Sequence, residues 1–219
     1  MAFKTACFIS YPHNAGKSVD AFVARLTDEL KDRPAQFVTD PVVTDHDFPT
    51  GADFNKAIAK AICESACLLV VYMPVYERKA FCIQEYVAME RHQTKRYQSL
   101  QRDLSDKFGM ILPLVYAGHE SKIPKWISQK INYKNISHAT IADPVSIFET
   151  GDFKRWLVEV ANLIDSLYNE FRATENVCAG CEADTLPDEA DKEVLSRLNG
   201  LCRNKGGRES QGPPSRLIR

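Results

Sequence analysis

The sequence lacks the long apolar run and the cationic excess that would indicate a membrane or nucleic acid as partner. No stretch of its 219 residues approaches the roughly 18 apolar residues of a membrane span. The opening MAFKTACFIS has one lysine and too short an apolar run for a secretory signal. The formal net charge of −1 gives no electrostatic reason to expect nucleic acid or an anionic membrane. We therefore expect a cytoplasmic protein that binds neither.

A disulfide framework and a complete metal site are also missing. Cys178 and Cys181 have the spacing of half a zinc site, but Cys202 stands alone and no histidine follows His138. We therefore predict no bound metal. Four of the seven cysteines lie in or beside core-like segments, which is typical of buried thiols in a reducing compartment. These four are Cys7, Cys63, Cys67 and Cys82.

Two catalytic signatures are absent as well. Gly16-Lys17-Ser18 is similar to the end of a phosphate-binding P-loop, but the first glycine of that loop would fall at Tyr11. No G-x-S-x-G elbow is present. His13 and His46 lie on loops after predicted strands, where a ligand contact and an ordinary loop histidine are both open interpretations.

The sequence does contain buried strands that alternate with amphipathic helices. We expect strands at residues 6–10, 42–44, 67–73 and 110–116, and a last edge strand at 136–142. Expected helices cover 18–31, 52–65, 82–92 and 151–171, with Phe54, Ile58, Ala61 and Ile62 on one side of the second. The polar segment 93–107 is expected to be partly helical and exposed. Strand-helix repeats of this kind predict an α/β fold, a parallel sheet with helices on both faces.

The composition changes after Arg172, first to acidic and then to a Gly, Pro, Ser and Arg-rich stretch. We expect one domain over residues 1–172 and a weakly ordered appendage over 173–219, in which one short helix can form.

The best candidate for chemistry is Glu85, in the first turn of the helix expected from Cys82 and just after a buried strand. The loops 11–16, 46–51 and 74–81 should meet at this edge of the sheet, where parallel α/β folds bind ligands. One carboxylate among aromatic rings suits the cleavage of an N-glycosidic bond to a pyridinium. The leaving group departs neutral, whereas the oxocarbenium-like ribose needs a negative charge. The alternative is a glutamate that the helix dipole stabilises and that has no catalytic role.

Three segments resemble the boxes of TIR (Toll/interleukin-1 receptor) domains, in order and in register over about residues 3–171. Phe8-Ile9-Ser10-Tyr11 followed by His13 resembles the first box. Asp47 to Gly51, with Phe54, Ile58 and Ser65, resembles the loop and helix after the second strand. Tyr76, Phe81-Cys82 and Glu85 resemble the Y-x-x-S-x-W-C-x-x-E segment. Lys79 replaces the serine of that segment, and Phe81 replaces its tryptophan.

This resemblance implies a flavodoxin-like five-stranded parallel sheet. It also implies cleavage of NAD⁺ to nicotinamide and ADP-ribose or a cyclised product, with Glu85 as the catalytic residue and NAD⁺ as substrate and not cofactor. The implied substrate-binding residues are Ser10, Tyr11, His13, Phe48, Gly51 and Phe81.

Members of this kind often act in immunity, including defence against phage. Homotypic TIR–TIR assembly and a separate sensor or effector protein are the implied partners. Two alternatives stay open: a non-catalytic adaptor that signals by TIR–TIR contact, and base exchange on nucleosides as in the nucleoside deoxyribosyltransferases.

Overall fold

Five parallel strands form one sheet in the order β2-β1-β3-β4-β5. The strands are β1 (Thr5–Ser10), β2 (Val42–Val43), β3 (Ser65–Tyr72), β4 (Ile111–Val115) and β5 (Lys134–Asn135). The computed structural model describes residues 3–32, 42–44, 47–48, 53–99, 109–128, 133–139, 143, 145–172 and 186–187. The predicted α/β fold with a five-stranded parallel sheet is confirmed.

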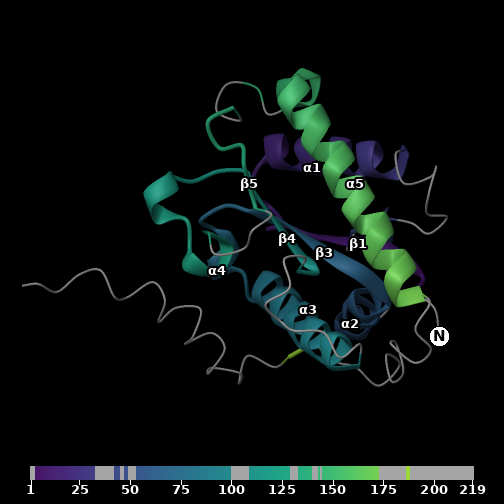
Figure 1. Ribbon diagram of the computed structural model, residues 1–219. Coiled ribbons are helices and arrows are strands. Elements are labelled where there is room, and N and C mark those ends of the chain that lie inside the picture. Colours follow the sequence, from purple (N-terminus) through teal and green to yellow (C-terminus); the bar gives the residue numbers. More distant parts are fainter. Residues whose placement is uncertain are drawn as a thin grey trace, which may run out of the picture.

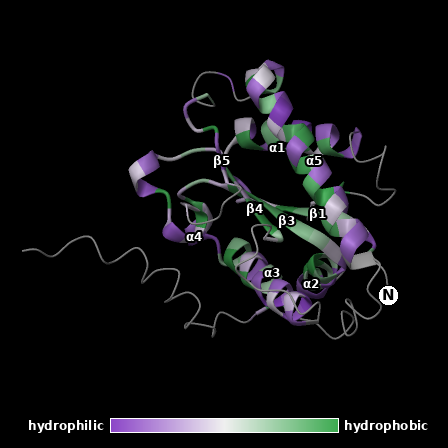
Figure 2. Ribbon diagram, in the orientation of Figure 1, coloured by the Kyte–Doolittle hydropathy of each residue, from purple (hydrophilic) through white to green (hydrophobic). Residues whose placement is uncertain are grey.

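Helices cover both faces of this sheet (Figure 1). Helices α1 (Lys17–Asp32) and α5 (Gly151–Arg172) lie on one face, and α2 (Phe54–Glu64) and α3 (Ala80–Ser99) lie on the other. A one-turn helix, α4 (Lys125–Ser128), and three 3₁₀ turns, η3 (Tyr76–Arg78), η4 (Glu120–Lys122) and η5 (Ser146–Glu149), occupy the connections. Figure 2 shows apolar strands between helices whose outer sides are largely hydrophilic. In the described part of the chain no helix is both long and apolar enough to cross a bilayer.

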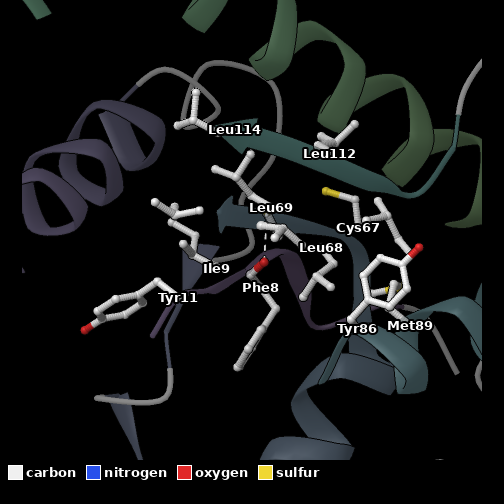
Figure 3. Close-up of a cluster of buried hydrophobic side chains, with 14 of the residues drawn as sticks. Phe8, Ile9, Tyr11, Cys67, Leu68, Leu69, Tyr86, Met89, Leu112 and Leu114 are labelled. Carbon is white, nitrogen blue, oxygen red and sulfur yellow. Dashed lines mark hydrogen bonds between the residues drawn. The ribbon is translucent and has the colours of Figure 1, made fainter. Parts of the chain in front are cut away.

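The sheet is buried on both faces, which explains why its central strands are continuous apolar runs. Ile9 and Leu69 are paired across β1 and β3, and so are Phe8 and Leu68. Figure 3 shows the first pair pointing to one side of the sheet and the second pair to the other, as the pleat requires. Residues of α3 such as Tyr86 pack below Leu68, so the helix that carries Glu85 is fixed to the core.

The topology places the ends of β1 and β3 next to each other. From β1 the chain crosses to β2 on one side, whereas β3, β4 and β5 follow on the other side. Ligands of open parallel sheets bind where the strand order reverses in this way, beyond the carboxyl ends of the strands. Ser10, the last residue of β1, is paired with Val70 there. The loops after β1 and β3 therefore leave the sheet side by side.

Helix α3 differs from the sequence-based expectation at both ends. It begins at Ala80 and not at Cys82, so Glu85 is its sixth residue and lies in the second turn. It continues to Ser99, and the expectation that this part is exposed is wrong for Gln93, Arg96 and Tyr97, which are buried. The reason is backbone hydrogen bonding: Gln93 Oε1 accepts from the Met110 amide at 2.7 Å, and Arg96 donates to main-chain carbonyls.

The edge strand was also predicted at the wrong residues. Strand β5 is Lys134–Asn135, and residues 137–139 form a turn, while 140–142 lie outside the described residues. Asn135 Oδ1 accepts from the Ser137 amide at 3.0 Å and from its hydroxyl at 2.8 Å. This turn bends the chain away from β4 and ends the strand.

Two further groups of predictions concern the burial of Phe54 and the state of four cysteines. Of the four residues expected on one side of the second helix, Ile58, Ala61 and Ile62 are buried, whereas Phe54 is the first residue of α2 and is 43% exposed. Cys7, Cys67 and Cys82 are free, buried thiols as expected, whereas Cys63 is disulfide-bonded.

The appendage is described at only two positions. Leu186 is 6% exposed and belongs to the main hydrophobic cluster, and Pro187 is buried beside it in the sequence. The Cys178–Cys181 pair and the rest of 173–219 lie outside the described residues, so the boundary at 172 stays a prediction.

Candidate active site

A cavity of about 450 Å³ opens at the edge of the sheet where the loops after β1 and β3 leave. Its walls come from the loop after β1, from the start of α2 and from the start of α3. The lining residues are Tyr11, His13, Asn14, Phe54, Lys79, Ala80, Phe81, Cys82 and Glu85. The position agrees with the switch point of the strand order.

The loop after β1 forms one wall through two stacked rings. Tyr11 is buried, and its ring lies 4.7 Å from the ring of His13 with an angle of 22° between them. The chain then turns sharply, with φ of 59° at Asn14 and 125° at Gly16. Asparagine tolerates such a conformation and glycine adopts it without strain, so this sequence can turn from β1 directly into α1.

The turn after β3 is held by a cluster of aromatic rings. The ring of Tyr76 lies 6.2 Å from that of Tyr72 and 6.3 Å from that of Trp126. The indole Nε1 of Trp126 donates to Glu77 Oε1 at 3.4 Å. Burial raises the pKa of Glu77, and the indole hydrogen bond partly opposes this effect. These contacts fix the segment that leads into α3 and thereby the position of Glu85.

Glu85 is 4% exposed and is connected to the sheet through hydroxyl groups. Its Oε2 lies 2.5 Å from Ser10 Oγ, which in turn lies 2.7 Å from the Tyr76 hydroxyl. Tyr76 donates to the main-chain carbonyl of Cys82 at 3.0 Å. Burial raises the pKa of Tyr76 well above its usual value, and the neighbouring Cys82 and Glu85 add to the effect, so Tyr76 stays a neutral phenol.

This geometry removes the helix-dipole explanation for the position of Glu85. A helix dipole acts on charges in the first turn, but Glu85 lies in the second turn of α3. Its carboxyl group contacts Ser10, at the end of β1, and lines a cavity. It is therefore placed as a group that can face a ligand and not as a helix cap.

The mouth of the cavity carries aromatic surface and one ammonium group. The rings of Phe54 and Phe81 meet edge to face at 5.8 Å, and they are 43% and 47% exposed. Lys79, which directly precedes α3, is half-buried and lines the same cavity. Exposed rings of this kind can stack on a planar heterocycle, and a lysine can meet a phosphate.

The structure brings most of the predicted site residues together. Glu85, Tyr11, His13 and Phe81 line the cavity. Ser10 does not line it; it is 1% exposed and lies beneath Glu85.

Two predicted site residues are not placed at the cavity. Phe48 packs against the hydrophobic core and is not among the lining residues. Gly51 lies outside the described residues.

Sequence reasoning missed Asn14, Ala80 and the role of Phe54 at the cavity. Tyr76 was expected at this edge as an aromatic residue of the loop 74–81 and as part of the third box, but its contact with Ser10 was not foreseen. Its spacing from Glu85 within that box was the available signal. Among the described residues no group of three His, Cys, Asp or Glu side chains converges as metal ligands would.

Fold and site together define a flavodoxin-like α/β domain with a buried carboxyl group at the ligand-binding edge of its sheet. The sequence matches the family model of the TIR domain over residues 7–145. The chain therefore belongs to the TIR domain family, which includes NADases and signalling adaptors.

Other comparisons add little to this assignment. No curated protein matches the sequence significantly. Among solved structures, the chain is similar to the TIR domains in the structure of the activated Roq1 resistosome directly recognizing the pathogen effector XopQ. The identity is 17%, the match covers 86% of this chain and 98% of that chain, and the TM-score is 0.40.

Proposed function

We propose that this TIR domain is an NAD⁺ glycohydrolase with Glu85 as its catalytic residue. The observation that carries the proposal is the position of the Glu85 carboxyl group, which is 4% exposed and lines a cavity at the switch point of the sheet. The aromatic rings of Tyr11, Phe54 and Phe81 in the same cavity support the binding of a flat pyridinium ring.

The reaction requires two things of the protein: a negative charge beside ribose C1′ and a site that holds the substrate in place. The bond between ribose C1′ and the pyridinium nitrogen breaks, and its electron pair stays on nitrogen, so nicotinamide leaves neutral without a general acid. The ribose becomes an oxocarbenium-like cation, which a carboxylate beside C1′ stabilises. Water then adds to C1′ and gives up a proton, which Glu85 can accept, and ADP-ribose results. Attack by a group of the substrate itself would give a cyclic product instead.

We infer that Tyr11, His13 and Phe81 contact the substrate, and that Ser10 acts through Glu85. Phe48 and Gly51 remain candidate contacts from the resemblance alone. We also propose homotypic TIR–TIR assembly, in immune or antiphage signalling, with a separate sensor or effector protein. This part of the proposal rests on membership of the TIR family alone.

The test is nicotinamide release from NAD⁺ by the purified chain at high protein concentration, followed by chromatography beside Glu85→Gln. We expect the wild type to release nicotinamide and the variant to lose at least about 100-fold in rate, as expected when a transition-state charge is removed. Equal release by both proteins would remove Glu85 from the mechanism. No release by assembled wild-type protein would favour the adaptor alternative.

A further inference from the structure

The hydroxyl group of Tyr76 connects the end of strand β1 with the start of helix α3 beneath the cavity. Its oxygen lies 2.7 Å from Ser10 Oγ, on the last residue of β1, and 3.0 Å from the main-chain carbonyl oxygen of Cys82, in the first turn of α3. Tyr76 itself is fully buried and belongs to neither element, since it lies in the turn η3. One side chain therefore bridges two elements that are far apart in the sequence.

The position of this hydroxyl group is fixed by the packing of the Tyr76 ring and by the backbone. The ring lies 6.2 Å from that of Tyr72 and 6.3 Å from that of Trp126. The Tyr76 amide donates to the Met73 carbonyl at 2.8 Å, and the Tyr76 carbonyl accepts from the Lys79 amide at 3.1 Å. Because ring and backbone are both held, the hydroxyl group has little freedom to move away from its two contacts.

The carboxyl group of Glu85 needs external support because a glutamate side chain is flexible. Several torsion angles separate the carboxyl group from the main chain of α3, and the last of them has broad minima. Ser10 donates to Glu85 Oε2 at 2.5 Å, a contact that suits the ionised carboxylate of the proposed reaction. Catalytic groups must be held within about 0.5 Å of their productive geometry, and a shift of about 1 Å can cost about 100-fold in rate.

We propose that Tyr76 is a positioning residue that acts on Glu85 through Ser10. This inference rests on the proposed function and extends the role inferred for Ser10. Tyr76 holds the Ser10 hydroxyl at the end of β1 and, through the Cys82 carbonyl, the first turn of the helix that carries Glu85. The donor and the acceptor of the Ser10–Glu85 contact therefore keep their distance. Glu85 has further interactions, so loss of the Tyr76 hydroxyl should reduce the rate without abolishing it.

The substitution Tyr76→Phe keeps the packed ring and removes the hydroxyl group. For NAD⁺ cleavage per folded molecule, we expect kcat to fall about fivefold, the equivalent of one net hydrogen bond, and KM to stay within about twofold. Tyr86→Phe is the matched control, because Tyr86 is also buried and packs on Trp126, but its hydroxyl bonds to Glu90. It should leave kcat within about twofold. Wild-type kcat in Tyr76→Phe overturns the proposal.

A double-mutant cycle tests whether Tyr76 acts through Ser10. Ser10→Val should lower kcat about tenfold or more, because it removes a hydrogen bond to a charged group. The nearly isosteric Ser10→Thr keeps the hydroxyl and should retain most of the rate, which a purely structural role of the side chain would not explain. In the Ser10→Val background, Tyr76→Phe should lower kcat little further. A further fivefold loss would mean that Tyr76 acts independently of Ser10, which overturns the proposal.

A second measurement does not depend on activity. NMR relaxation without substrate should give a high order parameter for the γ-methylene group of Glu85 in the wild type and in Tyr86→Phe, and a lower one in Tyr76→Phe and Ser10→Val. An equally high order parameter in the wild type and Ser10→Val overturns the proposal, even if Tyr76→Phe fails to fold. The expected loss of order, without NAD⁺ cleavage by the wild type, would refute the proposed function and leave the positioning role supported.

Discussion

Replacing Arg96 by methionine tests the contact that joins helix α3 to the junction of α2 and β3. Helix α2 ends at Glu64 and strand β3 begins at Ser65, with no loop between them. The carbonyls at this junction have no helical partner, as at any helix end. Arg96 is 2% exposed and donates to the Ser65 carbonyl at 2.8 Å and to the Cys63 carbonyl at 2.5 Å. Its guanidinium carbon also lies 4.6 Å from the centre of the Phe3 ring.

The size of the effect follows from these contacts. A hydrogen bond to a charged group contributes about 1.5–3 kcal/mol, and Arg96 makes two to main-chain carbonyls. Methionine keeps much of the apolar packing and no longer buries a charge, which offsets part of the loss. We therefore expect Arg96→Met to lower the free energy of unfolding by about 2–4 kcal/mol. For a chain of this size that lowers Tm by about 4–16 °C.

The assay is thermal and urea unfolding of the full chain, followed by circular dichroism. Arg91→Met is the matched control, because Arg91 lies on the same helix but is exposed. We expect it to change stability by less than about 0.5 kcal/mol. If Arg96→Met melts within the range of the control, the main-chain contacts of Arg96 do not stabilise the fold and the reasoning is refuted.

Two further predictions concern the mouth of the cavity and the appendage. Lys79→Met should weaken NAD⁺ binding about fivefold at low salt, since a half-buried ammonium beside a phosphate contributes about 1 kcal/mol. Calorimetric titration should show no such loss for nicotinamide riboside, which has no phosphate, nor for Arg78→Met as control; equal losses for both ligands would contradict a phosphate contact. Ending the chain at residue 172 removes Leu186, whose burial contributes about 2 kcal/mol, so Tm should fall by about 4–8 °C. Unchanged melting would instead support a dispensable appendage.

The sheet was predictable because its central strands are buried on both faces. ACFIS, CLLVVYM and MILPLVY are continuous apolar runs of strand length, and they became β1, β3 and β4 within one or two residues at each end. The edge strand was not predictable in the same way. Lys134 and Asn135 are polar, and no pattern in the sequence marks them as a strand. They pair with Leu114 and Val115, respectively, because the tertiary structure places them beside β4.

The sequence could predict those residues of the site that lie on loops following parallel strands. Loops after parallel strands meet at one edge, so the sequence alone brought Tyr11, His13, Phe81 and Glu85 together. The partners of Glu85 could not be found in this way. A start of α3 at Cys82 places Glu85 in the first turn, whereas the start at Ala80 places it in the second. The contact with Ser10 follows from the three-dimensional packing of α3 on β1.

Lys79 and Phe81, the two positions where the sequence departs from the third TIR box, lie apart from the hydrogen-bonded side chains of Glu85, Ser10 and Tyr76. Lys79 and Phe81 both line the cavity wall, and Phe81 is half exposed at its mouth. Neither takes part in the chain from Glu85 through Ser10 to Tyr76. Under the proposed mechanism, groups at the mouth bind the substrate and the transition state alike, whereas the charge of Glu85 matters most when the ribose cation forms. The departures should therefore act mainly on KM, and changes to Ser10 or Tyr76, which position Glu85, mainly on kcat.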